Sequence, residues 1–415
     1  MADQSRNTEH RSPRYAESLD LGNLIQAVLR QFWVVRGSLV EGRERILVLL
    51  SRADMAAIGP TKGPTKARAR ALVEAGTLTV LTRSYGSSQW SLARSRLEKG
   101  LAMCREADDR EGAALALVFL GSTTRAQGEY SLARSYYEQS MTIYRELQDR
   151  SGIARCQANL GALAHGQADN AAAHSLLEQA LELSRELGDK VYTTRVLVSM
   201  GELCYAEGNY ATARSLSEES LTLSRELKHR GEIAESLHML GVLARVEGDY
   251  ARAGLLHEEA LELYRELGRM PGYVLASVGY VANRQGDYRR AGTLFAEGLS
   301  FEQQAGGNED LALCLIGSAG VAVGGADPTA GADREARASS SKGARRAARL
   351  LGAAEALLEA IGKKWEPADR IEYDRYVAAT RAQLDEAAFD AAWAEGRAMS
   401  MEQAISYALS SAVSD

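Results

Sequence analysis

The chain of 415 residues is poor in proline and cysteine, with 6 and 4 of them respectively. Few prolines leave long stretches able to form helix, because proline removes a backbone donor and breaks a helix interior. The cysteines lie far apart and include no CxxC pair. This pattern argues against a zinc site or a disulfide framework, and it favours buried thiols in a reducing compartment. The four are Cys104, Cys156, Cys204 and Cys314.

The sequence also lacks a basic excess, a signal peptide and an apolar run of membrane length. A net charge of -6 gives no whole-chain signal for direct nucleic-acid binding. Residues 1–18 are polar and contain no apolar core segment. The longest uncharged run, residues 311–326, is shorter than the roughly 20 residues that a membrane helix needs. We therefore expect a cytoplasmic protein with neither a membrane nor a nucleic-acid partner.

What the sequence does contain is an internal repeat of about 40 residues. A turn-aromatic column recurs at Trp90, Tyr130, Tyr210, Tyr250 and Tyr288, with Asn170 in the missing slot. An alanine column follows three residues later, at Ala93, Ala133, Ala173, Ala213, Ala253 and Ala291. A glycine column stands nine residues before most of the aromatics, at Gly121, Gly161, Gly201, Gly241 and Gly279. Three columns in one register indicate a repeated structural unit.

Each unit predicts two helices that pack on each other. In the unit around Tyr250, one apolar helical face precedes Gly248-Asp249 and another follows it. The small residues Gly241 and Ala253 fit the crossing of the two helices, where a bulky side chain would hold the axes apart. Because such a pair cannot bury both of its faces alone, neighbouring pairs are expected to stack.

The pattern resembles the tetratricopeptide repeat (TPR). Leu240-Gly241, Ala253 and Ala260 match its small-residue positions, and Tyr250 matches its turn aromatic. The period is longer than the usual TPR period of about 34. The resemblance implies an all-α fold, a right-handed TPR solenoid of about seven helix pairs with helical caps.

Composition shifts predict how the chain is divided. We expect a disordered N-terminus over 1–18, an N-terminal helical cap over 19–58 and a Gly/Pro linker over 59–66. The TPR array then covers 67–323, a flexible Gly/Ala/Ser-rich insertion 324–342, and the last repeat helix with a C-terminal helical cap 343–415. Pro367 suits a helix start, and Ser400 with Gln403 forms a capping-box pattern.

The flanks add a second resemblance. "FWVVRGSLVEGRERILVLL" before the repeats and "AARLLGAAEALLEAIGKKWEPADRIEYDRY" after them are similar to the sensor region of bacterial signal-transduction ATPases, the MalT-like and LuxR-type regulators. This resemblance implies a sensing or scaffolding role. No Walker A motif precedes the repeats and no helix-turn-helix follows them, so nucleotide and DNA chemistry are not carried over.

No residue set indicates catalysis. His257-Glu258-Glu259 is not an HExxH motif, because Leu261 stands where the second histidine would be. The residues equivalent to His257 in the other units vary as a packing position does; they are Tyr137, Leu177, Ser217 and Phe295. No Ser/His/Asp or Cys/His set can be assembled. We expect no enzyme activity, no metal and no cofactor.

The candidate binding residues lie on the first helix of each pair, which lines the concave face in TPR superhelices. Positions six and three before the glycine column, and one and four after it, give Arg125, Arg155, His165, Arg195, Glu202, Tyr205, His238, Arg245, Tyr273, Tyr280 and Asn283, with Arg284 beside them. Arginine and tyrosine are enriched at binding hot spots. The row predicts binding of a protein or peptide, with a preference for acidic segments, or of a small anionic inducer. The alternative is a solvated helix face with incidental arginines.

Three functional hypotheses follow. The first is a non-enzymatic TPR sensor or scaffold in bacterial signalling or transcriptional regulation. The second is a free-standing adaptor that captures a peptide and has no link to transcription. The third is an enzyme hidden in the C-terminal helices, for which no residue can be nominated. Exposed solenoid ends also allow self-association.

Overall fold

The computed structural model describes residues 41–48, 66–81, 87–268, 270–305, 308–324 and 334–410. A short helix covers 41–48. The segment 1–18 predicted to be disordered, most of the predicted N-terminal cap, nearly all of the linker 59–66 and the middle of the insertion lie outside these ranges.

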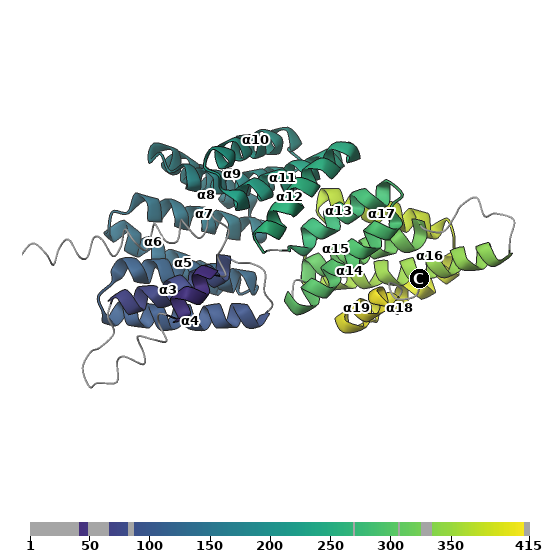
Figure 1. The fold of residues 1–415 in the computed structure, drawn as a ribbon, viewed down its shortest axis with the longest axis horizontal. Coiled ribbons are helices and arrows are strands. Elements are labelled where there is room, and N and C mark those ends of the chain that lie inside the picture. The colour runs from purple at the N-terminus through teal and green to yellow at the C-terminus, as the bar shows by residue number, and fades with distance from the viewer. Residues whose placement is uncertain are drawn as a thin grey trace, which may run out of the picture.

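The described helices form seven consecutive pairs, and the described residues contain no strand (Figure 1). The pairs are α3 (Lys66–Leu81) with α4 (Ser87–Glu106), α5 (Arg110–Ala126) with α6 (Tyr130–Glu146), α7 (Arg150–Gly166) with α8 (Asn170–Glu186), α9 (Lys190–Ala206) with α10 (Tyr210–Glu226), α11 (Arg230–Val246) with α12 (Tyr250–Glu266), α13 (Gly272–Arg284) with α14 (Tyr288–Ala305), and α15 (Asn308–Gly324) with α16 (Arg334–Ala360). Three further helices follow: α17 (Pro367–Arg381), α18 (Glu386–Arg397) and α19 (Met401–Leu409). The predicted all-α solenoid is confirmed.

Helix boundaries follow from local chemistry at the turns. An aspartate or asparagine caps most helix starts, and its side chain accepts a hydrogen bond from the backbone N–H three residues on. These caps are Asp109, Asp149, Asp169, Asp189, Asn209 and Asp249. The residue before the cap has a left-handed backbone, as at Gly208 (φ 80) and Gly248 (φ 82). This conformation ends the preceding helix and suits glycine best.

Replacing Ala168 by glycine is expected to raise the free energy of unfolding by about 0.5–1 kcal/mol. Ala168 stands where other units have glycine, and its φ of 60 carries steric strain from its Cβ. Urea denaturation of the variant measures the gain. The same change at Ala162, inside helix α7, is the control and should lower stability, because glycine is a poor helix former.

The repeated columns pack the two helices of each pair. Every residue of the alanine column is fully buried. A Cβ added at Gly241 would lie 2.6 Å from the His257 ring, and one at Gly121 would lie 2.5 Å from the Tyr137 ring. Gly161 and Gly279 approach Leu177 and Phe295 in the same way. The glycine column therefore makes room for the column that contains His257, which is confirmed as a buried packing position.

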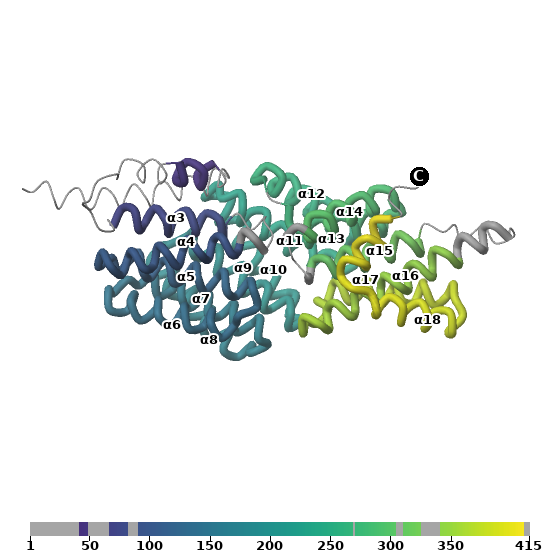
Figure 2. Tube along the Cα trace, turned by 90° about the horizontal axis from the view of Figure 1, so that it is seen from below, coloured from purple at the N-terminus to yellow at the C-terminus, as the bar shows by residue number. Residues whose placement is uncertain are grey.

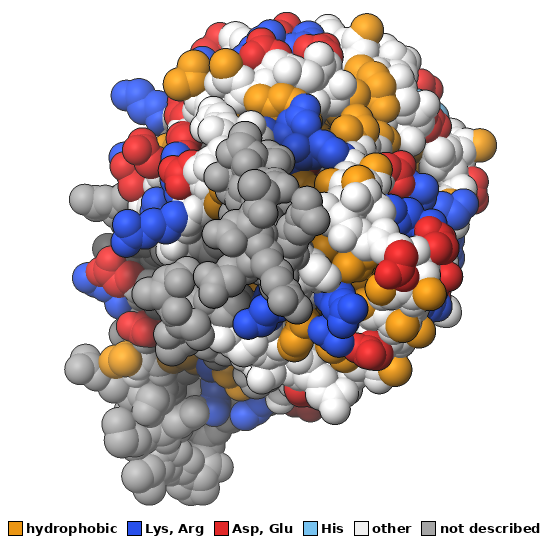
Figure 3. Space-filling model, turned by 90° about the vertical axis from the view of Figure 1, so that its right-hand side faces the viewer, with side chains coloured by type: hydrophobic (Ala, Val, Ile, Leu, Met, Phe, Trp, Pro, Cys, Tyr) orange, Lys and Arg blue, Asp and Glu red, His pale blue; other side chains and the backbone are white. Residues whose placement is uncertain are grey.

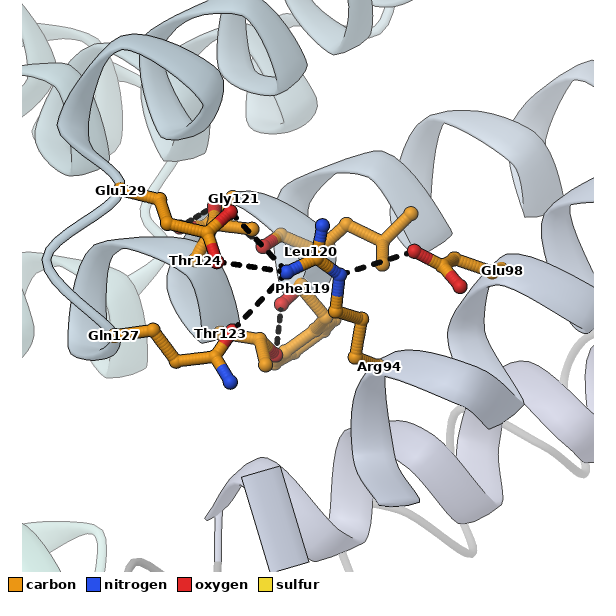
Figure 4. A network of polar contacts seen from close by, with 9 residues as sticks. All are labelled: Arg94, Glu98, Phe119, Leu120, Gly121, Thr123, Thr124, Gln127 and Glu129. Carbon is orange, nitrogen blue, oxygen red and sulfur yellow. Dashed lines mark hydrogen bonds and ion pairs between the residues drawn. The ribbon is translucent and has the colours of Figure 1, made fainter. Parts of the chain in front are cut away.

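Ion pairs connect successive repeats on the outer surface. Figure 4 shows Arg94 of α4 donating to Glu129 at 2.9 Å, in the turn after α5, and to Glu98 at 3.1 Å. Later repeats place equivalent pairs at His174 with Glu207 and at Arg214 with Glu247. Each exposed pair contributes only about 0–1 kcal/mol.

Helices α17, α18 and α19 close the C-terminal end. Pro367 opens α17, and Ser400 with Gln403 forms the capping box of α19, as predicted. Helix α16 begins at Arg334, inside the range expected for the insertion. On this end of the molecule, positive and negative side chains of the described residues are interspersed (Figure 3). Helix α17 runs back along the array and contacts α11, α15 and α16 (Figure 2).

Candidate interaction surface

The first helices α5, α7, α9, α11 and α13 carry the predicted row of binding residues, which we call the first-helix face. Its C-terminal part already holds a polypeptide segment, the start of α17. The Ala368 N–H donates to the Tyr205 hydroxyl at 2.8 Å. Arg245 donates to the Ala368 carbonyl at 3.3 Å and to Asp369 Oδ1 at 3.0 Å. Backbone and side chain of the segment are thus both recognised.

The contact continues over the next two turns of α17. The Tyr250 hydroxyl donates to Glu372 Oε1 at 2.9 Å, and Asn283 Nδ2 donates to the Tyr376 hydroxyl at 2.8 Å. Glu372 is fully buried, and Arg375 of the same helix also donates to it. Helix α17 therefore crosses α9, α11 and α13 with acidic side chains aimed at the first-helix face.

Arg245 is the centre of this contact. Arg245 is only 3% exposed to solvent, and its guanidinium lies over the Tyr280 ring, 4.7 Å from the ring centroid. Ser277 Oγ accepts a further hydrogen bond at 3.4 Å. Burial opposes the charged form, but the carboxylates of Asp369 and Glu372 outweigh it and raise the pKa of Arg245. The guanidinium is therefore charged in the folded protein.

These contacts correct one expectation of the sequence reading. Tyr205, Arg245, Tyr280 and Asn283 were expected to be exposed in the groove, but all four are buried. The reason is that α17, more than 90 residues away along the chain, covers Tyr205, Arg245 and Asn283. Tyr280 also packs on α15, where its hydroxyl donates to the Leu313 carbonyl at 2.7 Å. Arg284 is exposed, as expected, and its guanidinium lies 4.3 Å from the centre of the Tyr250 ring.

The middle of the face is a half-buried polar cluster. The Tyr273 hydroxyl donates to Glu235 Oε2 at 3.1 Å and lies 3.1 Å from the Tyr264 hydroxyl. His238 packs edge-on against Tyr273, with ring centroids 4.8 Å apart, and its ring lies 5.1 Å from that of His257. Both predicted residues of this part, His238 and Tyr273, therefore contact side chains of the chain itself.

The two histidines make stability depend on pH. Burial lowers the pKa of His238 to about 4 and that of His257 well below its usual value, and nearby Arg245 acts in the same direction. Above about pH 7.5 both imidazoles are almost wholly neutral whether the chain is folded or not, so they add little pH dependence. Below that pH the unfolded chain binds protons that the folded chain does not, so stability falls as the pH drops toward 4.

Replacing His257 by leucine is expected to raise the free energy of unfolding by about 1–3 kcal/mol at neutral pH. Both ring nitrogens of His257 are buried without a hydrogen-bond partner, and leucine occupies the same column at Leu177. The variant should also lose less stability between pH 7.5 and 5. Urea denaturation at both pH values measures the two effects. If the variant loses as much free energy of unfolding between pH 7.5 and pH 5 as the wild-type chain does, His257 does not contribute to the pH dependence.

The N-terminal part of the face has a different character. The Arg155 guanidinium lies 5.9 Å from the centre of the Tyr192 ring on α9, and the Tyr192 hydroxyl donates to the Arg155 carbonyl at 3.2 Å. Arg195 donates to Glu232 at 3.0 Å, and Glu202 is exposed. Tyr192 was not in the predicted row. A tyrosine three residues before Arg195 was the available signal.

Arg125 and His165 complete the row and are both partly buried. Burial lowers the pKa of His165, and the positive charge of Lys363 acts in the same direction. Lys363 belongs to the segment between α16 and α17, so that segment approaches α7 before α17 reaches α9. Within the ranges given above, His, Cys, Asp and Glu side chains form no cluster of three or more suited to a metal. None of the helices in those ranges is long and apolar enough to span a membrane.

Seven stacked helix pairs with one shared face of first helices define a helical-repeat solenoid. The tetratricopeptide repeat family model matches residues 85–146, 112–186 and 192–266, so this part of the solenoid consists of tetratricopeptide repeats. All four cysteines are buried free thiols, as expected.

Solved structures of similar fold include a Rap protein in complex with Competence and Sporulation Factor. It aligns with a TM-score of 0.51 and 13% identity over 87% of this chain and 99% of that chain. The apo form of RapI aligns with a TM-score of 0.44 and 18% identity, over 65% of this chain and 97% of that chain. BtubC from P. vanneervenii aligns with a TM-score of 0.42 and 20% identity, over 52% of this chain and 91% of that chain. No curated protein matches the chain in sequence. At these identities the likeness concerns the fold.

Proposed function

We propose that this chain is a non-catalytic scaffold that binds a peptide or protein segment on its first-helix face. One observation carries the proposal: this face holds a polypeptide segment of the chain itself, through Tyr205, Arg245 and Asn283. A surface that pairs with both backbone and side chains of one segment has the chemistry to bind another. TPR arrays present such extended surfaces because each repeat adds one more helix to the same face.

The setting we propose is bacterial signalling, as a cytoplasmic sensor or scaffold. Its support is the similarity of the flanking segments to the sensor regions of signal-transduction ATPases, together with the TPR array itself. A Rap protein of similar fold has been solved in complex with Competence and Sporulation Factor. A small anionic inducer would use the same face of this chain. A neighbouring reading frame encoding an ATPase or helix-turn-helix module would support the regulator over a free-standing adaptor.

A peptide-display selection against the purified chain tests the binding function. Selected 12-residue peptides should protect backbone amides of α5, α7 and α9 from hydrogen exchange. Replacing Ala158 by tryptophan should abolish their binding, because Ala158 is partly exposed on first helix α7. Gln139→Trp on second helix α6, where Gln139 is exposed, is the matched control and should bind normally. Peptides that protect only second helices would contradict the proposal.

A further inference from the structure

The Arg245 contact shows how this face binds a carboxylate. A guanidinium on one first helix lies over the tyrosine ring of the next first helix, 4.7 Å from Tyr280. The carboxylate of Asp369 then pairs with the guanidinium at 3.0 Å. The ring and the carboxylate together offset the loss of water around the cation.

The same pair of residue types occurs two repeats earlier, without a carboxylate. Arg155 of α7 lies over the Tyr192 ring of the next first helix, α9, at 5.9 Å. The bond from the Tyr192 hydroxyl to the Arg155 carbonyl, at 3.2 Å, fixes the two helices relative to each other. Within the described ranges, the Arg155 guanidinium forms no ion pair with a carboxylate. Arg245, near the end of α11, and Arg155, near the start of α7, thus share the contact of a guanidinium with a tyrosine ring. They differ in whether the chain supplies the acid.

The charges around Tyr192 favour an anion. Arg155 of α7 and Arg195, on the same helix α9 as Tyr192, both bring positive charge to the Tyr192 hydroxyl. Glu232 pairs with Arg195 at 3.0 Å and offsets one of the two positive charges. The carboxylate of Asp149, at the start of α7, also acts on Arg155, but among the described residues it forms no ion pair with it. The Arg155 guanidinium is partly buried and held over a ring, and its direct carboxylate position is open. A planar guanidinium in this position suits a carboxylate, which it can bind through two parallel hydrogen bonds.

We infer that Arg155 and Tyr192 form a carboxylate-binding site that takes an aspartate or glutamate of an acidic peptide segment. This inference rests on the proposed function and adds the chemistry of the ligand. On this inference the segment runs from Arg155 along α7, over the small, partly exposed side chains of Ala158 and Ala162. The acidic start of α17 is the precedent for the ligand class, because Asp369 meets the equivalent arrangement at Arg245.

Two fluorescent libraries of 12-residue peptides test the inference. In one, alternate positions are aspartate or glutamate; in the other they are asparagine or glutamine, and the remaining positions are identical mixtures. Wild-type chain should bind the acidic library at least about tenfold more tightly than the amide library. Arg155→Gln should remove most of that preference. Arg150→Gln, on the same helix but exposed and paired with Glu186, is the matched control and should keep it.

The outcomes separate the inference from the proposed function. Equal binding of both libraries overturns the acidic preference and leaves the scaffold function standing. Equal losses in Arg155→Gln and Arg150→Gln show bulk charge attraction and overturn the site. Binding of neither library overturns both proposals. Arg155→Lys keeps the positive charge but cannot form the two parallel hydrogen bonds of a guanidinium, so it should lose several-fold of the preference for the acidic library. This variant serves as the test if Arg155→Gln does not fold.

Discussion

Replacing Arg245 by alanine is expected to release α17 from the first-helix face and to lower the free energy of unfolding by about 3–5 kcal/mol. The loss is large because the substitution removes one partner of a buried ion pair. Asp369 would lose its cation, and the Ala368 carbonyl would lose a donor. The Tyr280 ring would also lose the guanidinium that lies over it.

Hydrogen exchange of the α17 amides and urea denaturation measure this effect. The control is Arg230→Ala, on the same helix α11. It removes the exposed ion pair between Arg230 and Glu266 of α12, whose charged groups lie 3.0 Å apart. Exposed pairs contribute about 0–1 kcal/mol, so the control should change little. If Arg245→Ala retains the wild-type protection of α17, the apolar contacts of the helix are sufficient and Arg245 does not hold it.

The placement of α17 changes what the first-helix face offers. Its C-terminal part, from Tyr205 to Asn283, serves to hold the chain's own cap. The cap also belongs to the core, since Tyr373 and Tyr376 pack with α15 and α16. An external partner is therefore expected at the N-terminal part, on α5, α7 and α9. The contact in the C-terminal part indicates the kind of partner, because it pairs an arginine with an acidic segment.

The solenoid could be predicted from the sequence because its determinants are local and repeated. Gly241, Ala253 and His257 meet within one helix pair, and the same three positions recur every 40 residues or so. Chance similarity does not produce several such columns in one register. The charges were harder to place. Arg265 lies 4.0 Å from Glu297 of the next repeat, a contact between repeats that helix periodicity alone does not predict.

The contact between α17 and the first helices could not be predicted by periodicity, because it joins residues that the repeat does not relate. Tyr205 and Ala368 are 163 residues apart. The usable signal was chemical: the segment around Asp369 and Glu372 is acidic, and the predicted row was rich in arginine. The residues of the row lie on first helices, and their role in binding stays a prediction. Which side chains of the row are exposed to solvent could not be predicted, because this depends on where α17 covers the first helices.

Alanine substitutions in the glycine column are expected to have opposite effects in two repeats. At Gly121 the new methyl group would lie 2.5 Å from the Tyr137 ring, which is fully buried and cannot move away. The overpacking lowers the free energy of unfolding by about 1–3 kcal/mol. At Gly201 the nearest atom is Ser217 Oγ at 3.3 Å, so a shift of a few tenths of an ångström makes room while the hydroxyl keeps its bond to the Ala213 carbonyl. Here the better helix propensity of alanine should give a gain of up to about 1 kcal/mol.

A compensating pair of substitutions would test whether the two columns act together. Gly241→Ala alone should destabilise the chain, because the methyl group would lie 2.6 Å from the His257 ring. His257→Ser reproduces the pair found at Gly201 and Ser217, so the double variant should be more stable than the sum of the two single effects predicts. Urea denaturation of all four chains gives the coupling energy, expected to be about 1–2 kcal/mol. Additive effects would mean that the glycine column is small for a reason other than the side chain facing it.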